Sequence, residues 1–171
     1  MAALIPSASA TGSGTMTLAG PSTNSNQTIS IPDTTGTMMV SGNMPAFSAY
    51  QSSSQTLTAA TLTKILFQTE EFDTNNNFAS STFTPTVAGY YQVTGSIRCG
   101  NTQIRTFIYK NGSQYKLGTD VSVGYNAMAG TLVYCNGSTD YIEFYALVTG
   151  GGSVSAASAE TWFNGCLVRA A

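Results

Sequence analysis

The sequence of 171 residues contains no histidine. Histidine is the commonest general base, the usual partner of a nucleophilic serine or cysteine, and the commonest zinc ligand. Nucleotide-binding loops are missing as well: Gly12 and Gly14 begin a GxGxxG pattern, but Thr17 stands where the third glycine is needed, and no GxxxxGK[ST] pattern exists. These absences argue against the common hydrolases, zinc sites and nucleotide sites, and we expect a protein that is not an enzyme.

Charged residues are scarce too, at 8% of the chain against about 25% in typical domains. The formal net charge is −2, and no basic patch is available to neutralise phosphates, so nucleic-acid binding is not expected. The sequence has no cationic amphipathic helix and no long apolar run, so no membrane partner is expected either. Polar, uncharged residues take the place of the charges. Such a surface suits a protein that packs against copies of itself or against a larger assembly.

Only three cysteines occur, at positions 99, 135 and 166, and none belongs to a CxxC pair. Because Cys99, Cys135 and Cys166 are widely spaced and have apolar neighbours, we predict buried free thiols. One disulfide plus one free thiol is the alternative. The first residues lack a positively charged segment and a long apolar stretch, so a secretion signal is not expected.

The chain divides into two regions by composition. Residues 1–44 are rich in serine, threonine and glycine, contain no aromatic residue, and carry one charge, at Asp33. We interpret them as a short extended arm or trimeric fibre stalk, with a solvated linker as the alternative. Residues 45–171 are rich in aromatic residues and turns, and are expected to form one head domain.

Alternating apolar and polar residues predict strands throughout the second region. The clearest is 89–99, where Tyr91, Val93, Ile97 and Cys99 share one face. A second strand, 104–109, ends at a turn in which Asn111 and Gly112 favour a hairpin. Segments 131–135 and 141–148 are expected to pair with each other, and 162–168 forms the last strand. No segment has a helical apolar stripe, so the fold class is all-β.

Several short motifs in this region resemble one known family. Residues 83–91 read Phe-Thr-Pro-Thr-Val-Ala-Gly-Tyr-Tyr, residues 108–112 read Ile-Tyr-Lys-Asn-Gly, and residues 163–168 read Phe-Asn-Gly-Cys-Leu-Val. Their order, with further matches at 46–49, 65–78 and 137–142, resembles the globular head domain of complement component 1q, a relative of tumour necrosis factor. The resemblance implies a ten-stranded antiparallel jelly-roll sandwich that packs as a homotrimer.

A trimer would bury apolar side chains between its subunits. Candidates are residues on strands that have apolar groups on both faces; the alternative for each is an ordinary place in the sandwich core. These trimer-interface candidates are Tyr90, Tyr91, Phe107, Tyr109 and Tyr145.

The only cluster of acidic residues is Glu70, Glu71 and Asp73, followed by three asparagines. Its hard oxygen donors could hold calcium, as in some members of the resembled family, with Glu71, Asp73 and Asn75 as candidate ligands. The spacing lacks the regular pattern of a calcium loop, and a solvated acidic turn is the alternative. No other cofactor is expected.

The animal members of the resembled family often carry a collagen stalk, which is absent here. Residues 31–38, Ile-Pro-Asp-Thr-Thr-Gly-Thr-Met, are instead similar to repeats in bacteriophage fibres. We therefore expect a structural protein at the surface of a phage virion: a trimeric tail or head fibre. Residues 1–44 would bind other virion proteins, and the head would bind a host surface glycan or protein through loops 72–82, 111–127 and 149–160. One alternative is a capsid cement or decoration protein that stabilises the shell at three-fold positions, and a further one is a secreted recognition module.

Overall fold

The computed structural model describes residues 44–100, 103–122 and 125–171. The chain divides between Thr35 and Gly36 into two units, and only the second contains described residues. The predicted arm or stalk, residues 1–44, therefore lies outside the described residues except for Met44.

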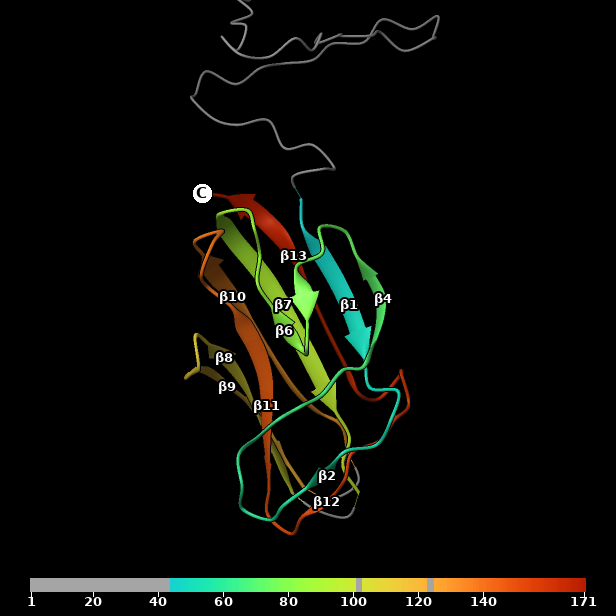
Figure 1. The fold of residues 1–171 in the computed structure, drawn as a ribbon. Helices are drawn as coiled ribbons and strands as arrows, with labels where there is room; N and C mark the ends of the chain where they lie inside the picture. Colours follow the sequence, from blue (N-terminus) through green and yellow to red (C-terminus); the bar gives the residue numbers. More distant parts are fainter. Residues whose placement is uncertain (1–43, 101–102, 123–124) are drawn as a thin grey trace, which may run out of the picture. The chain divides into compact units, whose positions relative to one another are not determined.

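The described residues form strands and no helix, which confirms the predicted all-β class (Figure 1). Accordingly, this part of the chain has no helix that could cross a membrane. The strands are β1 (Ala46–Tyr50), β2 (Thr56–Leu57), β3 (Thr63–Lys64), β4 (Thr69–Asp73), β5 (Phe78–Ala79), β6 (Thr82–Phe83), β7 (Gly89–Ile97), β8 (Ile104–Lys110), β9 (Ser113–Val121), β10 (Ala127–Cys135), β11 (Ile142–Val148), β12 (Gly152–Ser153) and β13 (Trp162–Ala170).

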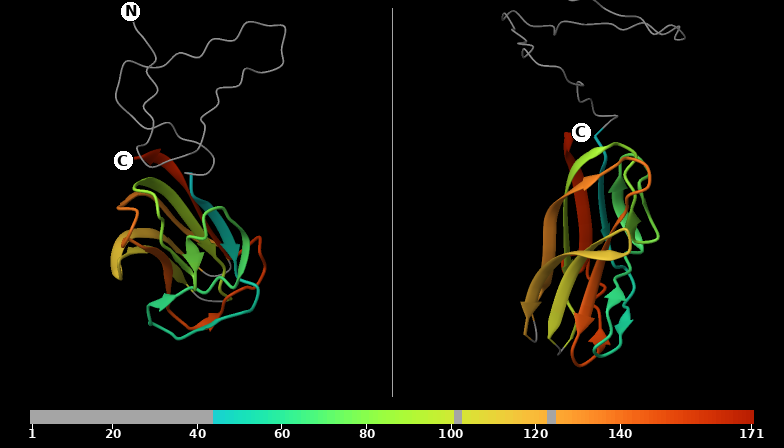
Figure 2. Two further views of the ribbon diagram at one scale, coloured as in Figure 1. Left: turned by 45° about the horizontal axis from the view of Figure 1, so that its top comes forward. Right: turned by 90° about the vertical axis from the view of Figure 1, so that its left-hand side faces the viewer.

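Two antiparallel sheets pack face to face as a sandwich (Figure 2). The first sheet has the order β10-β7-β13-β1-β4, and the second has the order β5-β6-β11-β8-β9, with β3 also paired to β11. A separate two-stranded ladder joins β12 to β2. The described residues thus form thirteen strands rather than the expected ten. Five of them have only two residues, too few to produce an alternating sequence pattern.

Aromatic side chains from both sheets fill the space between them. Phe47 on β1 stacks on Phe78 and Phe83 of the second sheet, with ring centroids 4.7 and 4.4 Å apart. It also meets Phe163 of β13 edge to face at 5.1 Å. Each fully buried ring contributes about 1.5–3 kcal/mol through removal from water. This cluster therefore fixes how the two sheets lie on each other.

Strand β7 follows the predicted alternation from Gly89 to Val93, but Ser96 is buried as well, and the strand ends at Ile97 rather than at Cys99. Tyr91, Val93 and Ile97 are completely buried. The hydroxyl of Tyr91 donates a 2.7 Å hydrogen bond to the carbonyl oxygen of Val87, in the segment just before the strand. Burial raises the pKa of Tyr91 well above its usual range. The tyrosine therefore enters the core with its polar atom satisfied.

The hairpin predicted at Asn111 and Gly112 is present. Both residues have positive φ, 52° and 74°, and they join β8 to β9. The second strand of the hairpin is a correction, because residues 113–121 were expected to lie in a contact loop and instead form β9.

The predicted pairing of segments 131–135 and 141–148 is wrong. β10 pairs with β7 in the first sheet, whereas β11 pairs with β8 in the second. The segment between them is built as a crossover: Oδ1 of Asn136 accepts main-chain N–H bonds of 2.9–3.0 Å from Ser138, Thr139 and Asp140. This side chain closes the turn locally, so the chain can pass from one sheet to the other instead of folding back on itself.

All three cysteines are free. Cys99 and Cys135 are buried, as predicted, and burial raises the pKa of the Cys135 thiol to about 11. Cys166 is exposed, which corrects the prediction for that residue. It lies between the buried Gly165 and Leu167 on β13, so the strand alternation turns its side chain outward.

The head domain begins and ends on one side of the sandwich. Ala46 at the start of β1 pairs with Cys166 near the end of β13, and we call this side the terminal end. The opposite side, the far end, carries the β2–β12 ladder (Figure 1).

Candidate interaction surfaces

The outward face of the first sheet carries several exposed apolar side chains. Because Tyr91 and Val93 point into the core, their neighbours on β7 point away from it. Five large apolar residues on β7, β10 and β13 are 40–60% exposed, and we call them the first-sheet face: Tyr90, Met128, Leu132, Tyr134 and Val168.

The strand register connects these side chains. Tyr134 lies opposite Tyr90, with ring centroids 5.5 Å apart, and Leu132 lies opposite Gln92. The cross-strand partner of Gln92 on β13 is Cys166, which is also uncharged. The other cross-strand partner of Tyr90, Arg169 on β13, borders these side chains with a charge. Exposed apolar side chains gathered on one sheet face make this face a candidate contact surface.

The outward face of the second sheet has an exposed apolar side chain too, Leu117 on β9 at 57%, but it differs in its aromatic row. Phe107 and Tyr109 on β8 and Tyr145 on β11 form an aromatic row, in which the rings of Tyr109 and Tyr145 stack at a centroid distance of 4.2 Å. Beside this row Nζ of Lys64 lies 2.7 Å from Oε1 of Glu143. Burial, followed by the negative charge of Glu143, raises the pKa of Tyr145. The second sheet therefore carries aromatic and paired charged groups together.

The five predicted interface residues do not share one surface. Tyr90 belongs to the first-sheet face, whereas Phe107, Tyr109 and Tyr145 lie on the other side of the sandwich. Tyr91 is completely buried, so its place in the core corrects its prediction as an interface residue.

Sequence reasoning missed four residues of the first-sheet face. The signal was available in segment 127–135, where positions 127, 129, 133 and 135 are buried and the even positions between them are exposed or half-exposed. Parity alone could have placed Met128, Leu132 and Tyr134 on one face of their strand. It could not say which neighbouring strand completes that face.

The calcium candidates lie at the end of β4 and in the turn after it. Oδ2 of Asp73 accepts a 2.7 Å bond from the main-chain N–H of Phe78, and Oδ1 accepts one from Asn75. Oε2 of Glu71 accepts a 2.7 Å bond from the hydroxyl of Ser48. The carboxylates of Glu71 and Asp73 thus accept hydrogen bonds from different parts of the protein. Within the described ranges no three acidic or thiol side chains gather around a point.

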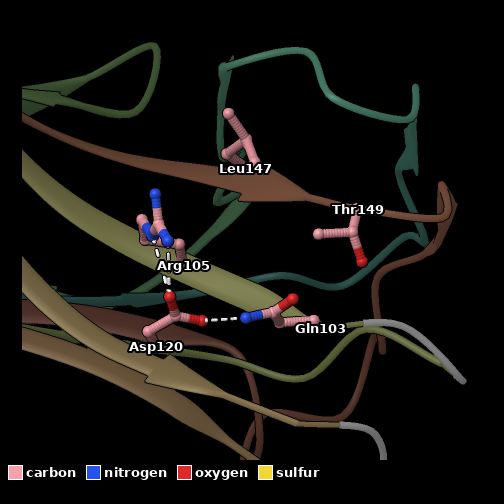
Figure 3. A pocket seen from close by; sticks show the side chains of 5 residues that line it. All are labelled: Gln103, Arg105, Asp120, Leu147 and Thr149. Carbon is pink, nitrogen blue, oxygen red and sulfur yellow. Dashed lines mark hydrogen bonds and ion pairs between the residues drawn. The ribbon is translucent and has the colours of Figure 1, made fainter.

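A small pocket opens on the second sheet, with a volume of about 80 Å³. Nε and Nη2 of Arg105 lie 3.0 and 2.6 Å from Oδ2 of Asp120, and Nε2 of Gln103 donates a 2.7 Å bond to Oδ1 of the same carboxylate (Figure 3). Leu147 and Thr149 form the opposite wall. The hydrogen bonds from Arg105 and Gln103 lower the pKa of Asp120. The carboxylate is therefore charged and fixed at neutral pH.

The predicted contact loops are dispersed. Residues 74–77 turn at the terminal end, whereas residues 149–160 lie at the far end, beside the β2–β12 ladder (Figure 1). These loops therefore do not form one contact surface within a single chain.

Comparison with known proteins gives a likeness in structure only. No family model matches the sequence, and no curated protein matches it. Murine APRIL has a TM-score of 0.58 and 7% identity, with 73% of this chain and 99% of that chain covered. The globular domain of zebrafish complement 1qA has a TM-score of 0.54 and 18% identity, covering 74% and 98%. The Eiger tumour necrosis factor of S. frugiperda has a TM-score of 0.56 and 7% identity, covering 75% and 93%. The described head therefore has the jelly-roll fold that tumour necrosis factors and complement 1q globular domains share.

Proposed function

We propose that three copies of the chain associate through the first-sheet face and that this trimer is a structural and adhesive protein of a bacteriophage particle. The observation that carries the proposal is the first-sheet face itself. Its side chains Leu132 and Val168 keep 49% and 60% of their surface in water in a single chain. Covering such a patch with identical copies would stabilise the assembly through the hydrophobic effect.

Support for three-fold association comes from the resemblance to complement 1q and tumour necrosis factor heads, which implies a trimer. The low overall charge also fits, since 8% charged residues leave much of the surface without ions. No catalytic activity is part of the proposal.

Support for a phage fibre comes from the resemblance of residues 31–38 to fibre repeats. Since the head begins and ends at the terminal end, attachment through residues 1–44 would leave the far end free to meet a host surface. A fibre head that is attached at one end and contacts the host with the other needs this arrangement.

The first test is the mass of the full chain in solution. Sedimentation velocity at micromolar concentration should give three times the 17.8 kDa of the single chain. A monomer there would remove the basis of the whole proposal.

The second test separates fibre from cement. Quantitative mass spectrometry of purified virions should find at most a few dozen copies per particle for a fibre, whereas hundreds of copies would assign the protein to the capsid shell. A fibre head should also compete with phage adsorption when it is added as a soluble trimer.

A further inference from the structure

The pocket of Figure 3 lies on the sheet that the proposed trimer leaves uncovered. Arg105 on β8 is two residues from Phe107, and Leu147 on β11 is two residues from Tyr145, so pocket and aromatic row share the outward face of the second sheet. The register brings them together, since Leu147 pairs with Arg105 and Tyr145 with Phe107.

The opposite charges of Arg105 and Asp120 cancel, but both groups can make further hydrogen bonds. The two bonds to Asp120 engage two of the five N–H donors of the Arg105 guanidinium. The carboxylate of Asp120 has further lone pairs beyond the three hydrogen bonds that it accepts. An anion in this pocket would meet Asp120 and a cation would meet Arg105. A neutral ligand with many hydroxyl groups suits both.

The surroundings favour the same chemistry. Leu147 gives the pocket an apolar wall, and the stacked rings of Tyr109 and Tyr145 continue the face beyond it. Aromatic faces beside fixed polar groups match a molecule that has C–H surfaces and hydroxyl edges. A volume of about 80 Å³ admits one edge of a sugar ring, with the next ring lying over the aromatic row.

We propose that this pocket, together with the aromatic row, binds a neutral saccharide. The inference rests on the proposed function, in which the head adheres to a host surface, and it names both the site and the ligand class. The ligand surface then lies on the sheet opposite to the subunit surface.

The test uses the full chain with methyl glycosides of glucose, galactose, mannose and N-acetylglucosamine, and with methyl glucuronide as the anionic comparison. Amide chemical shifts should move at β8, β9 and β11 for at least one neutral glycoside, with a dissociation constant on the order of 1 mM because the contact is small. Methyl glucuronide should bind more weakly.

Matched variants locate the site. Arg105→Leu should weaken binding by about tenfold or more, because a charged donor is lost. Arg98→Leu is the control: its ion pair with Glu160 leaves the arginine side chain 46% exposed, against 47% for Arg105, but it lies outside the pocket. Asp120→Asn should reverse the preference toward methyl glucuronide, an effect that a merely structural role would not produce.

The outcomes separate this inference from the proposed function. Three outcomes would each overturn the pocket proposal. They are no binding of any neutral glycoside, tighter binding of methyl glucuronide by the unmodified chain, and an equal loss of affinity in the two arginine variants. Sedimentation and adsorption competition, measured on the same samples, test the trimeric fibre independently. If the Arg105→Leu variant is trimeric and competes with adsorption as well as the unmodified chain, the trimeric fibre is supported and the pocket is refuted as the site that binds the host.

Discussion

Replacing Leu132 is the most direct way to test the role of the first-sheet face. Burying a whole leucine contributes about 1.5–3 kcal/mol, so covering the 49% that Leu132 exposes contributes about 1 kcal/mol per subunit. Three copies of Leu132→Ala should therefore cost a trimer about 3 kcal/mol, which weakens its overall dissociation constant by about 100-fold. Leu132→Asp adds the cost of burying an unpaired carboxylate in each subunit and should give monomers at micromolar concentration.

Sedimentation velocity gives the assembly state of each variant, and thermal unfolding monitored by circular dichroism shows whether the head still folds. The control is Leu62→Asp, which places the same charge on a 38% exposed leucine in the loop between β2 and β3. It should remain trimeric. If Leu132→Asp stayed trimeric, or if both variants dissociated equally, the first-sheet face would not be the subunit interface.

Three further predictions concern the fold. Tyr91→Phe should lower stability by about 1 kcal/mol, seen as a lower urea midpoint, because the partly buried carbonyl of Val87 loses its donor; the mass of the trimer should not change. Gly95→Ala should cost about 1–3 kcal/mol because its methyl group would overlap the Phe144 ring, whereas Gly100→Ala, with open space around it, should be neutral in the same titration. Hydrogen bonds from Asn111 and then Lys110 lower the pKa of Asp140. The charged carboxylate therefore stabilises the fold above about pH 4, and this contribution is lost as pH falls through the folded pKa. Asp140→Asn should unfold at a lower urea concentration at pH 7, and its stability should fall less steeply in acid.

The strands that the sequence predicted correctly are those whose two faces meet different surroundings. In β7 the alternation between Tyr91 and Val93 inside and Tyr90 and Gln92 outside is complete, so period two is visible without any structure. The turn at Asn111 was equally visible, because positive φ restricts the residue types that fit there.

Pairing between strands is different, because it depends on contacts between distant parts of the chain. Nothing in segments 131–135 and 141–148 shows that a turn built on Asn136 leads into the other sheet. Periodicity also assigns a side chain to one of two faces without saying which is inside. For this reason Tyr90 and Tyr91, adjacent in sequence, were both interface candidates, although only Tyr90 can reach another molecule.

The same limit explains why the outward aromatic residues looked alike in the sequence and differ in the fold. Phe107 points away from the core, yet it is only 7% exposed, because the register places Tyr145 and Leu117 on either side of it. Its environment is thus already complete in one chain, whereas Leu132 and Val168 remain half in water. A side chain that its own sheet already buries adds little to the free energy of association with a second subunit. A side chain that is half exposed adds the transfer free energy of the part that becomes buried. This difference between Phe107 and Leu132 supports the proposed self-association through the first sheet, while Leu117, the neighbour of Phe107 on β9, is itself 57% exposed on the second sheet.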